Sequence, residues 1–134
     1  PNSLAGNQIL SLLEDRKGTL WVGTNNGLYA HEGEGRFTRY AMGLSSQFIS
    51  ALEEDKEGKL WVATLNGLGW LHPETGHLLV FDEMDGLQAP GFNLNASFSN
   101  SSGRVFFAGP QGVNHFLSSE IEYNTEPPVL RFSF

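Results

Sequence analysis

The side chains best suited to acid–base chemistry fall into two matching groups. Glu14 and Asp15 precede one glycine-containing turn, and Glu53, Glu54 and Asp55 precede another, 40 residues further along. A general acid/base pair is normally unique within a chain, whereas these carboxylates recur. An aspartate that opens a tight turn accepts hydrogen bonds from backbone N–H groups inside it. We therefore expect these carboxylates at turns and strand ends, and the sequence predicts no catalytic residue.

The histidines do not form a recognisable metal motif. No two of them have the three- or four-residue spacing of a helical metal site, and the chain contains no cysteine. No phosphate-binding loop, calcium loop or nucleophile elbow occurs either. We expect no metal and no cofactor, with surface or turn positions for the four histidines, which are His31, His72, His77 and His115.

Composition limits the partners that this chain can bind. Its formal net charge is −7, and its eight Lys and Arg residues are scattered along the sequence. Such a chain cannot neutralise a row of phosphates or hold an anionic membrane surface. It also lacks a run of about 18 apolar residues, the length that spans a bilayer. We expect neither nucleic acid nor direct membrane contact, and we interpret the chain as a segment of a longer protein.

A fifteen-residue sequence occurs twice. Residues 14–28 are EDRKGTLWVGTNNGL and residues 54–68 are EDKEGKLWVATLNGL, identical at ten of the fifteen positions. A weaker third copy, NSSGRVFFAGPQGV, occupies residues 100–113, where Phe106 aligns with Trp21 and Trp61. A period of about 40 to 45 residues indicates a structural unit that stacks on copies of itself.

Each copy is predicted to contain four short strands. An Asp-to-Gly turn follows the first strand, and an Asn-Gly hairpin turn follows the second. The segments between turns are rich in β-branched and aromatic residues and show no helical periodicity. The predicted strands are residues 9–14, 20–24, 28–31 and 36–40, then 49–54, 60–64, 68–72 and 77–81, and in the third copy 94–99 and 105–109.

Four antiparallel strands in a repeat of this length form one β-propeller blade. We therefore predict an all-β fold made of three four-stranded antiparallel blades, a fragment of a larger propeller. The predicted division is 1–8 for the end of a preceding inter-blade linker, 9–48 for blade 1, 49–93 for blade 2 and a long linker, 94–126 for blade 3, and 127–134 for the start of a following domain.

The tryptophans are predicted to have two different roles. Trp21 and Trp61 share one repeat position among apolar neighbours, so we expect both in the core between blades. Trp70 is not required by the repeat, because Ala30 occupies that position in the first copy. We place Trp70 near a blade surface, where its ring either packs or stacks on a ligand.

Three blades leave two faces without a neighbour. Propellers close into rings of about four to eight blades, and each blade buries both faces against others. The outer faces of the first and last blades should therefore expose apolar surface. We predict self-association through these open blade faces.

The string ED-x-x-G-x-LWV-[GA]-T-x-x-GL resembles the two-component regulator propeller repeat, and the likeness extends from residue 9 to about residue 124. In that family, such repeats form periplasmic sensor domains of hybrid two-component sensor histidine kinases. The third copy and the later Pro127-Pro128 are similar to the family's last blade, which precedes an immunoglobulin-like triple-tyrosine (Y-Y-Y) domain. The resemblance implies that residues 127–134 begin this domain. It also implies a periplasmic location on an inner-membrane protein and a role in signal transduction through a phosphorelay.

The candidate ligand site lies at one end of the blades. In a propeller, the turns between second and third strands share a face with the inter-blade linkers, and recognition concentrates in such loops. Amide groups beside an aromatic ring suit a neutral hydroxylated ligand, and the resemblance implies an oligosaccharide or another small ligand. The candidate ligand-binding residues are Asn26, Asn66, Trp70, Gln88, Phe92, Asn93 and Gln111.

Three functions remain open from the sequence. The first is a non-catalytic, ligand-sensing segment of a signalling protein. The second is a purely structural or dimerisation segment, with the ligand site in blades outside this chain. The third is a propeller enzyme, such as a lyase or a glycan hydrolase, which would need carboxylates or histidines converging at the central funnel.

Overall fold

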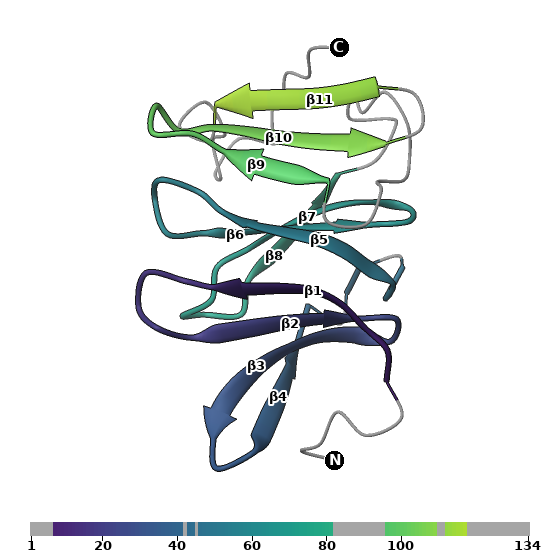
Figure 1. Cartoon of the computed structure of the whole chain (residues 1–134), viewed down its shortest axis with the longest axis vertical. Coiled ribbons are helices and arrows are strands. Elements are labelled where there is room, and N and C mark those ends of the chain that lie inside the picture. Colours follow the sequence, from purple (N-terminus) through teal and green to yellow (C-terminus); the bar gives the residue numbers. More distant parts are fainter. Residues whose placement is uncertain (1–6, 42, 45, 82–95, 110–111, 118–134) are drawn as a thin grey trace.

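The computed structural model contains eleven β-strands and no helix within the residues that it describes, which are 7–41, 43–44, 46–81, 96–109 and 112–117. The strands form three antiparallel sheets, and within each sheet the strands pair in sequence order. The sheets stack along the long axis of the molecule (Figure 1). The described part of the chain contains no helix that could cross a membrane. The predicted all-β fold of stacked blades is confirmed.

The first two blades are copies of each other. Blade 1 consists of β1 (Ile9–Glu14), β2 (Leu20–Thr24), β3 (Gly27–Gly33) and β4 (Arg36–Tyr40), and blade 2 of β5 (Ile49–Glu54), β6 (Leu60–Thr64), β7 (Gly67–Leu71) and β8 (Leu78–Phe81). Trp21 lies opposite Ala30, and Trp61 lies opposite Trp70. The equal register in the two sheets confirms the repeat inferred from the sequence.

The predicted bounds of β1, β2, β4, β5 and β6 agree with the structure. Strand β3 is longer than predicted, because its pairing with β4 continues through an irregularity as far as Gly33 and Arg36. Strand β7 ends one residue early, so His72 lies in the following turn.

Blade 3 contributes three strands within the described residues: β9 (Ser97–Ser99), β10 (Arg104–Gly109) and β11 (Gly112–Leu117). A fourth strand would follow Leu117, outside the described residues. The predicted boundaries after residues 93 and 126 also lie outside them. The division of the chain therefore stays a prediction.

A threonine fixes the turn between the second and third strands of both complete blades. The Thr24 hydroxyl accepts a hydrogen bond from the Asn26 N–H (2.9 Å) and donates one to the Gly27 carbonyl (2.9 Å). Thr64 makes the same two bonds with Asn66 (3.0 Å) and Gly67 (3.1 Å). Both threonines are buried. Because they make the same two hydrogen bonds, the two Asn-Gly turns are held in the same way.

The core consists of two apolar layers between blades. Residues of blades 1 and 2 form one layer around Trp21, and residues of blades 2 and 3 form the other around Trp61. The two tryptophans are 2% and 0% exposed, which confirms the predicted inter-blade positions. Strand β5 lies against both β1 and β9, so the first strands of the three blades are neighbours (Figure 1).

Candidate functional site

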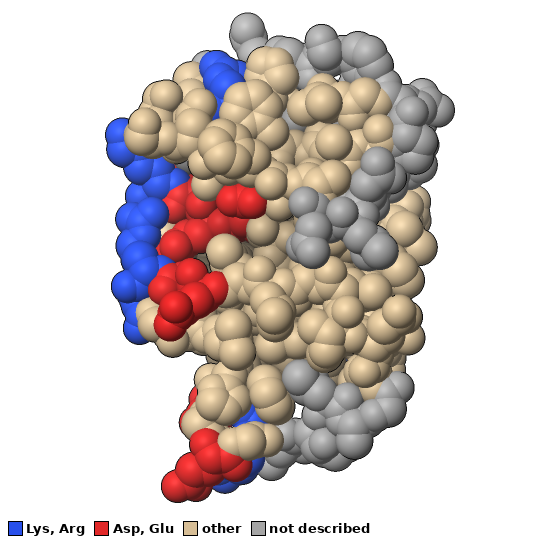
Figure 2. All heavy atoms as spheres, viewed as in Figure 1, with Lys and Arg blue, Asp and Glu red and all other residues tan. Residues whose placement is uncertain are grey.

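A cavity with a volume of about 400 Å³ lies between blades 1 and 2. Its walls include the β1–β2 turn, the end of β3 and the residues that follow β7, so both blades contribute to it. Charged side chains gather along this edge of the molecule, with acidic groups beside basic ones over the β1–β2 and β5–β6 turns (Figure 2). We refer to this cavity as the inter-blade cleft.

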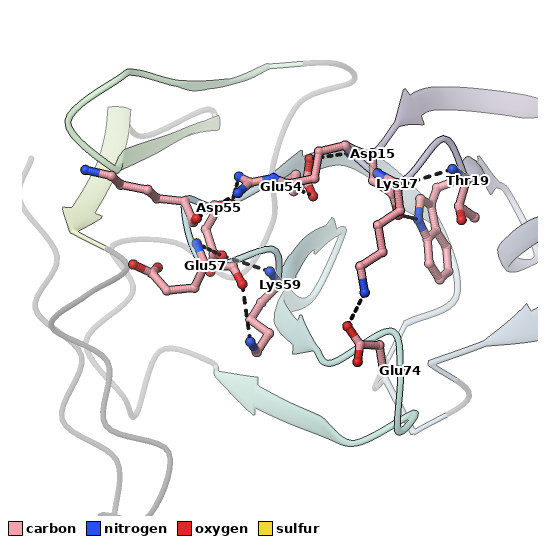
Figure 3. A network of polar contacts seen from close by, with 11 residues as sticks. Asp15, Lys17, Thr19, Glu54, Asp55, Glu57, Lys59 and Glu74 are labelled. Carbon is pink, nitrogen blue, oxygen red and sulfur yellow. Dashed lines mark hydrogen bonds and ion pairs between the residues drawn. The ribbon is translucent and has the colours of Figure 1, made fainter.

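An aspartate organises each of the turns beside the cleft. The Asp15 carboxylate accepts hydrogen bonds from the backbone N–H groups of Lys17 (3.0 Å) and Thr19 (2.9 Å). The Asp55 carboxylate makes the equivalent bonds to Glu57 (3.0 Å) and Lys59 (2.9 Å), as Figure 3 shows. The predicted turn role of both aspartates is confirmed.

The second oxygen of each aspartate binds an indole of the core. Trp21 Nε1 donates to Asp15 (2.9 Å), and Trp61 Nε1 donates to Asp55 (2.9 Å). Asp55 also accepts a bond from Trp70 Nε1 (3.1 Å) and is only 1% exposed. Burial raises the pKa of Asp55, and the bonds from Lys59, Trp61 and Trp70 oppose this effect. Each turn is thereby tied to the packing between blades.

Arg16 connects the β1–β2 turn to blade 2. Its backbone N–H and its guanidinium both contact the Glu54 carboxylate, at 3.0 and 3.3 Å. The guanidinium also donates to the backbone carbonyls of Asp55 (2.8 Å) and Lys56 (3.0 Å). One side chain therefore binds three consecutive residues of the neighbouring blade. We refer to these contacts as the Arg16 latch.

A second ion pair joins the two walls at the rim of the cleft. Lys17 binds Glu74, in the turn between β7 and β8 (Figure 3). This pair lowers the pKa of Glu74. Both side chains are largely exposed, so solvent screens their attraction and the pair adds little stability. The pair can therefore open at low cost.

His72 lies in the cleft wall, and burial lowers its pKa, helped by the nearby charge of Lys59. Its ring makes an edge contact with Trp70, at 5.2 Å between ring centroids. His31 and Tyr40 also line the cleft, from blade 1. The cleft thus offers imidazole and phenol groups beside charged groups, among which Arg16 pairs with Glu54 and Lys17 pairs with Glu74.

No group of three or more His, Asp and Glu side chains that could hold a metal occurs in the part of the chain that the structure describes.

Two of the predicted ligand-binding residues lie away from the cleft. Asn26 and Asn66 are exposed in the turns after β2 and β6, at the opposite strand ends from the cleft. Gln88, Phe92, Asn93 and Gln111 lie outside the described residues. The predicted ligand role of these six residues therefore stays a prediction.

The predicted surface position of Trp70 is wrong. Its side chain is 5% exposed and stacks on Trp61, with ring centroids 5.4 Å apart and an interplanar angle of 17°. Its indole N–H binds Asp55, so the ring has a packing partner and a hydrogen-bond partner in the core. The sequence suggested otherwise because Ala30 occupies the matching position of blade 1, so the repeat does not require a large side chain there.

Sequence reasoning also missed the cleft and both of its inter-blade ion pairs. Arg16 and Glu54 are 38 residues apart, and Lys17 and Glu74 are 57 apart, so neither pair has a local spacing that predicts it. The one available signal was the repeat itself, which places equivalent turns of adjacent blades side by side.

Stacked, repeated four-stranded sheets with inter-blade tryptophans define a segment of a β-propeller. Residues 3–26 and 43–66 match the family model described as two component regulator propeller. These two segments therefore belong to the two-component regulator propeller family of repeats. A comparison with curated proteins gave no match.

Solved structures with the same fold include two extracellular domains from B. thetaiotaomicron. The domain of BT3049, described as a hybrid two component system, has a TM-score of 0.75 and 20% identity, over 84% of this chain and 17% of that chain. The domain of BT4673, also described as a hybrid two component system, has a TM-score of 0.64 and 25% identity, over 87% of this chain and 17% of that chain.

A virginiamycin B lyase from Staphylococcus aureus also has this fold. Its TM-score is 0.67 at 15% identity, over 88% of this chain and 41% of that chain. Identity at this level shows the fold alone. The present chain spans less than half the length of each of these three structures.

Proposed function

We propose that this chain is a non-catalytic, ligand-sensing propeller segment from the periplasmic part of a bacterial two-component signalling protein. The observation that carries this proposal is the family match at residues 3–26 and 43–66. The likeness to the extracellular domain of BT4673, at 25% identity, supports it. The lyase likeness gives no comparable support for an enzyme, because it reflects the shared fold.

The inter-blade cleft suggests how binding would be transmitted. A ligand shifts a conformational equilibrium only by its difference in affinity for the two states. A solute in the cleft contacts blades 1 and 2 together, so its affinity depends on the angle between them. The exposed Lys17–Glu74 pair at the rim would break first, while the Arg16 latch would hold the turns together. A small rotation of blade 1 against blade 2 would then be the signal.

The ligand class in this proposal is a small, neutral, hydroxylated molecule such as an oligosaccharide. Hydroxyl groups can bind the carboxylates, the ammonium group and the imidazoles of the cleft, or the amides of the Asn-Gly turns at the other strand ends. The two locations make different predictions for variants.

The proposal is tested by calorimetry and thermal shift with neutral glucan, mannan and galactan hexasaccharides. Binding that is lost in Tyr40→Phe and His31→Ala but kept in Asn26→Ala and Asn66→Ala would locate the ligand in the cleft, and the reverse would locate it at the turns. Binding by a longer ectodomain but not by this chain would favour a purely structural segment. A parent gene without a signal sequence and a membrane span would contradict the sensor proposal.

A further inference from the structure

The Arg16 latch has an incomplete copy one repeat further along the chain. In the latch, the N–H and the guanidinium of Arg16 bind the Glu54 carboxylate at 3.0 and 3.3 Å. Lys56 of blade 2 holds the place of Arg16, 40 residues later, and Ser99 of blade 3 holds the place of Glu54, 45 residues later. The second interface therefore has the cation of the latch but lacks its carboxylate.

The turns of blades 2 and 3 support this alignment. The Asp55 N–H donates to the Lys59 carbonyl (2.9 Å), and the Asn100 N–H, 45 residues later, donates to the Arg104 carbonyl (3.0 Å). Strand β5 also lies against β9, as β1 lies against β5. Because the turns close in the same way and the first strands are neighbours in both interfaces, Lys56 relates to blade 3 as Arg16 relates to blade 2.

A cavity of about 180 Å³ lies at this place, between the β5–β6 turn and the β9–β10 turn. Arg16, Lys56, Ser99 and Ser101 are among the residues that line it. Within the described ranges, no hydrogen bond or ion pair engages the Lys56 N–H, the Lys56 ammonium group or the Ser99 hydroxyl. The cavity, which we call the anion notch, therefore combines hydrogen-bond donors with two positive charges.

Two carboxylates also line the notch, and both are already bound to other groups. Glu54 pairs with Arg16 in the latch. The Asp55 carboxylate accepts two backbone N–H groups of its own turn and two indole N–H groups, and this residue is only 1% exposed. Neither carboxylate bonds to Lys56 in the part of the chain that the structure describes. The position that faces Lys56 is thus left to an acceptor from solution.

We propose that the anion notch binds the carboxylate group of a small acidic solute, in the place that the Glu54 carboxylate takes in the latch. The carboxylate accepts the N–H and the ammonium group of Lys56 and the Ser99 hydroxyl, and hydrogen bonds between ionised groups are stronger than neutral ones. The Glu54 side chain is 15% exposed, so the equivalent position is partly shielded from water. The bound anion bridges blades 2 and 3, at a different interface from the inter-blade cleft and independently of the ligand class proposed above.

The first experiment follows the backbone amide signals of the whole chain by NMR while sodium acetate replaces sodium chloride at constant ionic strength. Sodium glucuronate is the second probe, and glucose is the neutral control. The Lys56 amide signal should shift and saturate with acetate and with glucuronate, because a carboxylate accepts this N–H, and should not shift with glucose. An unmoved Lys56 signal, or a shift that rises linearly without saturating, would overturn the proposal.

Variants then locate the bound anion. Ser99→Glu supplies the missing carboxylate from the chain itself, so the dissociation constant of acetate should rise by about tenfold or more. The Lys56 amide signal of this variant should also move, without acetate, in the direction that acetate moves it in the wild-type chain. Lys56→Met keeps the N–H but removes the ammonium group, and should weaken acetate binding by about threefold to tenfold.

The matched control is Leu65→Glu, which adds the same charge in the exposed β6–β7 turn, away from the notch. Its dissociation constant for acetate should stay within about twofold of the wild-type value, because salt screens distant surface charges. Acetate binding that is unchanged in both Ser99→Glu and Lys56→Met, or weakened as much by Leu65→Glu, would show that the anion does not occupy the notch.

Discussion

The two inter-blade interfaces are built from the same repeat but held in different ways. The first, between blades 1 and 2, combines an apolar layer with the Arg16 latch and the Lys17–Glu74 pair. The second, between blades 2 and 3, is an aromatic layer in which Trp61 contacts Trp70, Phe81 and Phe116 at 4.5 to 6.0 Å between ring centroids. Its polar contacts across the blades include Ser97 with Glu53 (2.8 Å).

The equivalent turns of the three blades differ in the residue that accepts their hydrogen bonds. Asp15 accepts one indole N–H and Asp55 accepts two, whereas blade 3 has Asn100 in this place and Phe106 in place of the tryptophan. Asn100 still accepts the backbone N–H groups of Ser102 (3.1 Å) and Arg104 (3.0 Å). The turn needs an oxygen acceptor, and a carboxylate is present only where indole donors reach its second oxygen.

Removing Trp61, the tryptophan of the aromatic layer, should destabilise the protein more than any other change considered. Trp61→Ala should destabilise the fold by about 3–5 kcal/mol, as large core truncations do. The loss of unfolding free energy in Trp21→Ala should be about 1 kcal/mol smaller than the loss in Trp61→Ala. The reason is that each aromatic contact adds about 0.5–1.5 kcal/mol and Trp61 makes more of them. Urea denaturation of the two variants checks the order. Equal losses of unfolding free energy in the two variants would show that the aromatic contacts add no stability beyond that of burial.

An intermediate effect is expected at the aspartates. Asp55→Asn keeps the turn acceptor but points an amide N–H₂ at two buried indole N–H groups, which should cost about 2–4 kcal/mol. Asp15→Asn faces one indole at a less buried position and should cost about 1 kcal/mol. Thermal unfolding of both variants gives the comparison.

The blade 3 arrangement supplies the control for this prediction. Trp21→Phe added to Asp15→Asn recreates the pairing of Asn100 with Phe106. The tryptophan substitution should then cost less in the Asp15→Asn variant than in the wild-type chain, since the indole has already lost its acceptor. Strict additivity of the two changes would show that the hydrogen bond between Asp15 and Trp21 contributes no stability.

The smallest expected effect concerns the polar contacts of the first interface. Arg16→Ala removes the bonds to Glu54 and to two carbonyls, and should cost about 1 kcal/mol because the side chain is partly exposed. Lys17→Ala removes only the exposed pair with Glu74 and should leave the melting temperature unchanged. If Lys17→Ala were the more damaging, the rim pair and not the latch would hold the blades together.

Much of the fold follows from local sequence. The Asp-to-Gly and Asn-Gly turns limit where strands can begin and end, which is why five strand ranges were predicted without error. The inter-blade positions of Trp21 and Trp61 were predictable too. A large ring that recurs at one repeat position is expected in the packing of one blade against the next, because every blade makes that contact. The same argument failed for Trp70, because its burial depends on Trp61 and Asp55 rather than on the repeat.

The repeat period, the strands, their turns and the positions that face a neighbouring blade were predictable from the sequence alone, because turn hydrogen bonds and side-chain alternation are local features that recur in each copy. The position of the cleft and the charges that bridge it became apparent only in the folded structure. Arg16, Glu54, Lys17 and Glu74 come together through the stacking of two blades. The angle and separation of those blades are set by the packing of many apolar side chains, and no local pattern records that packing.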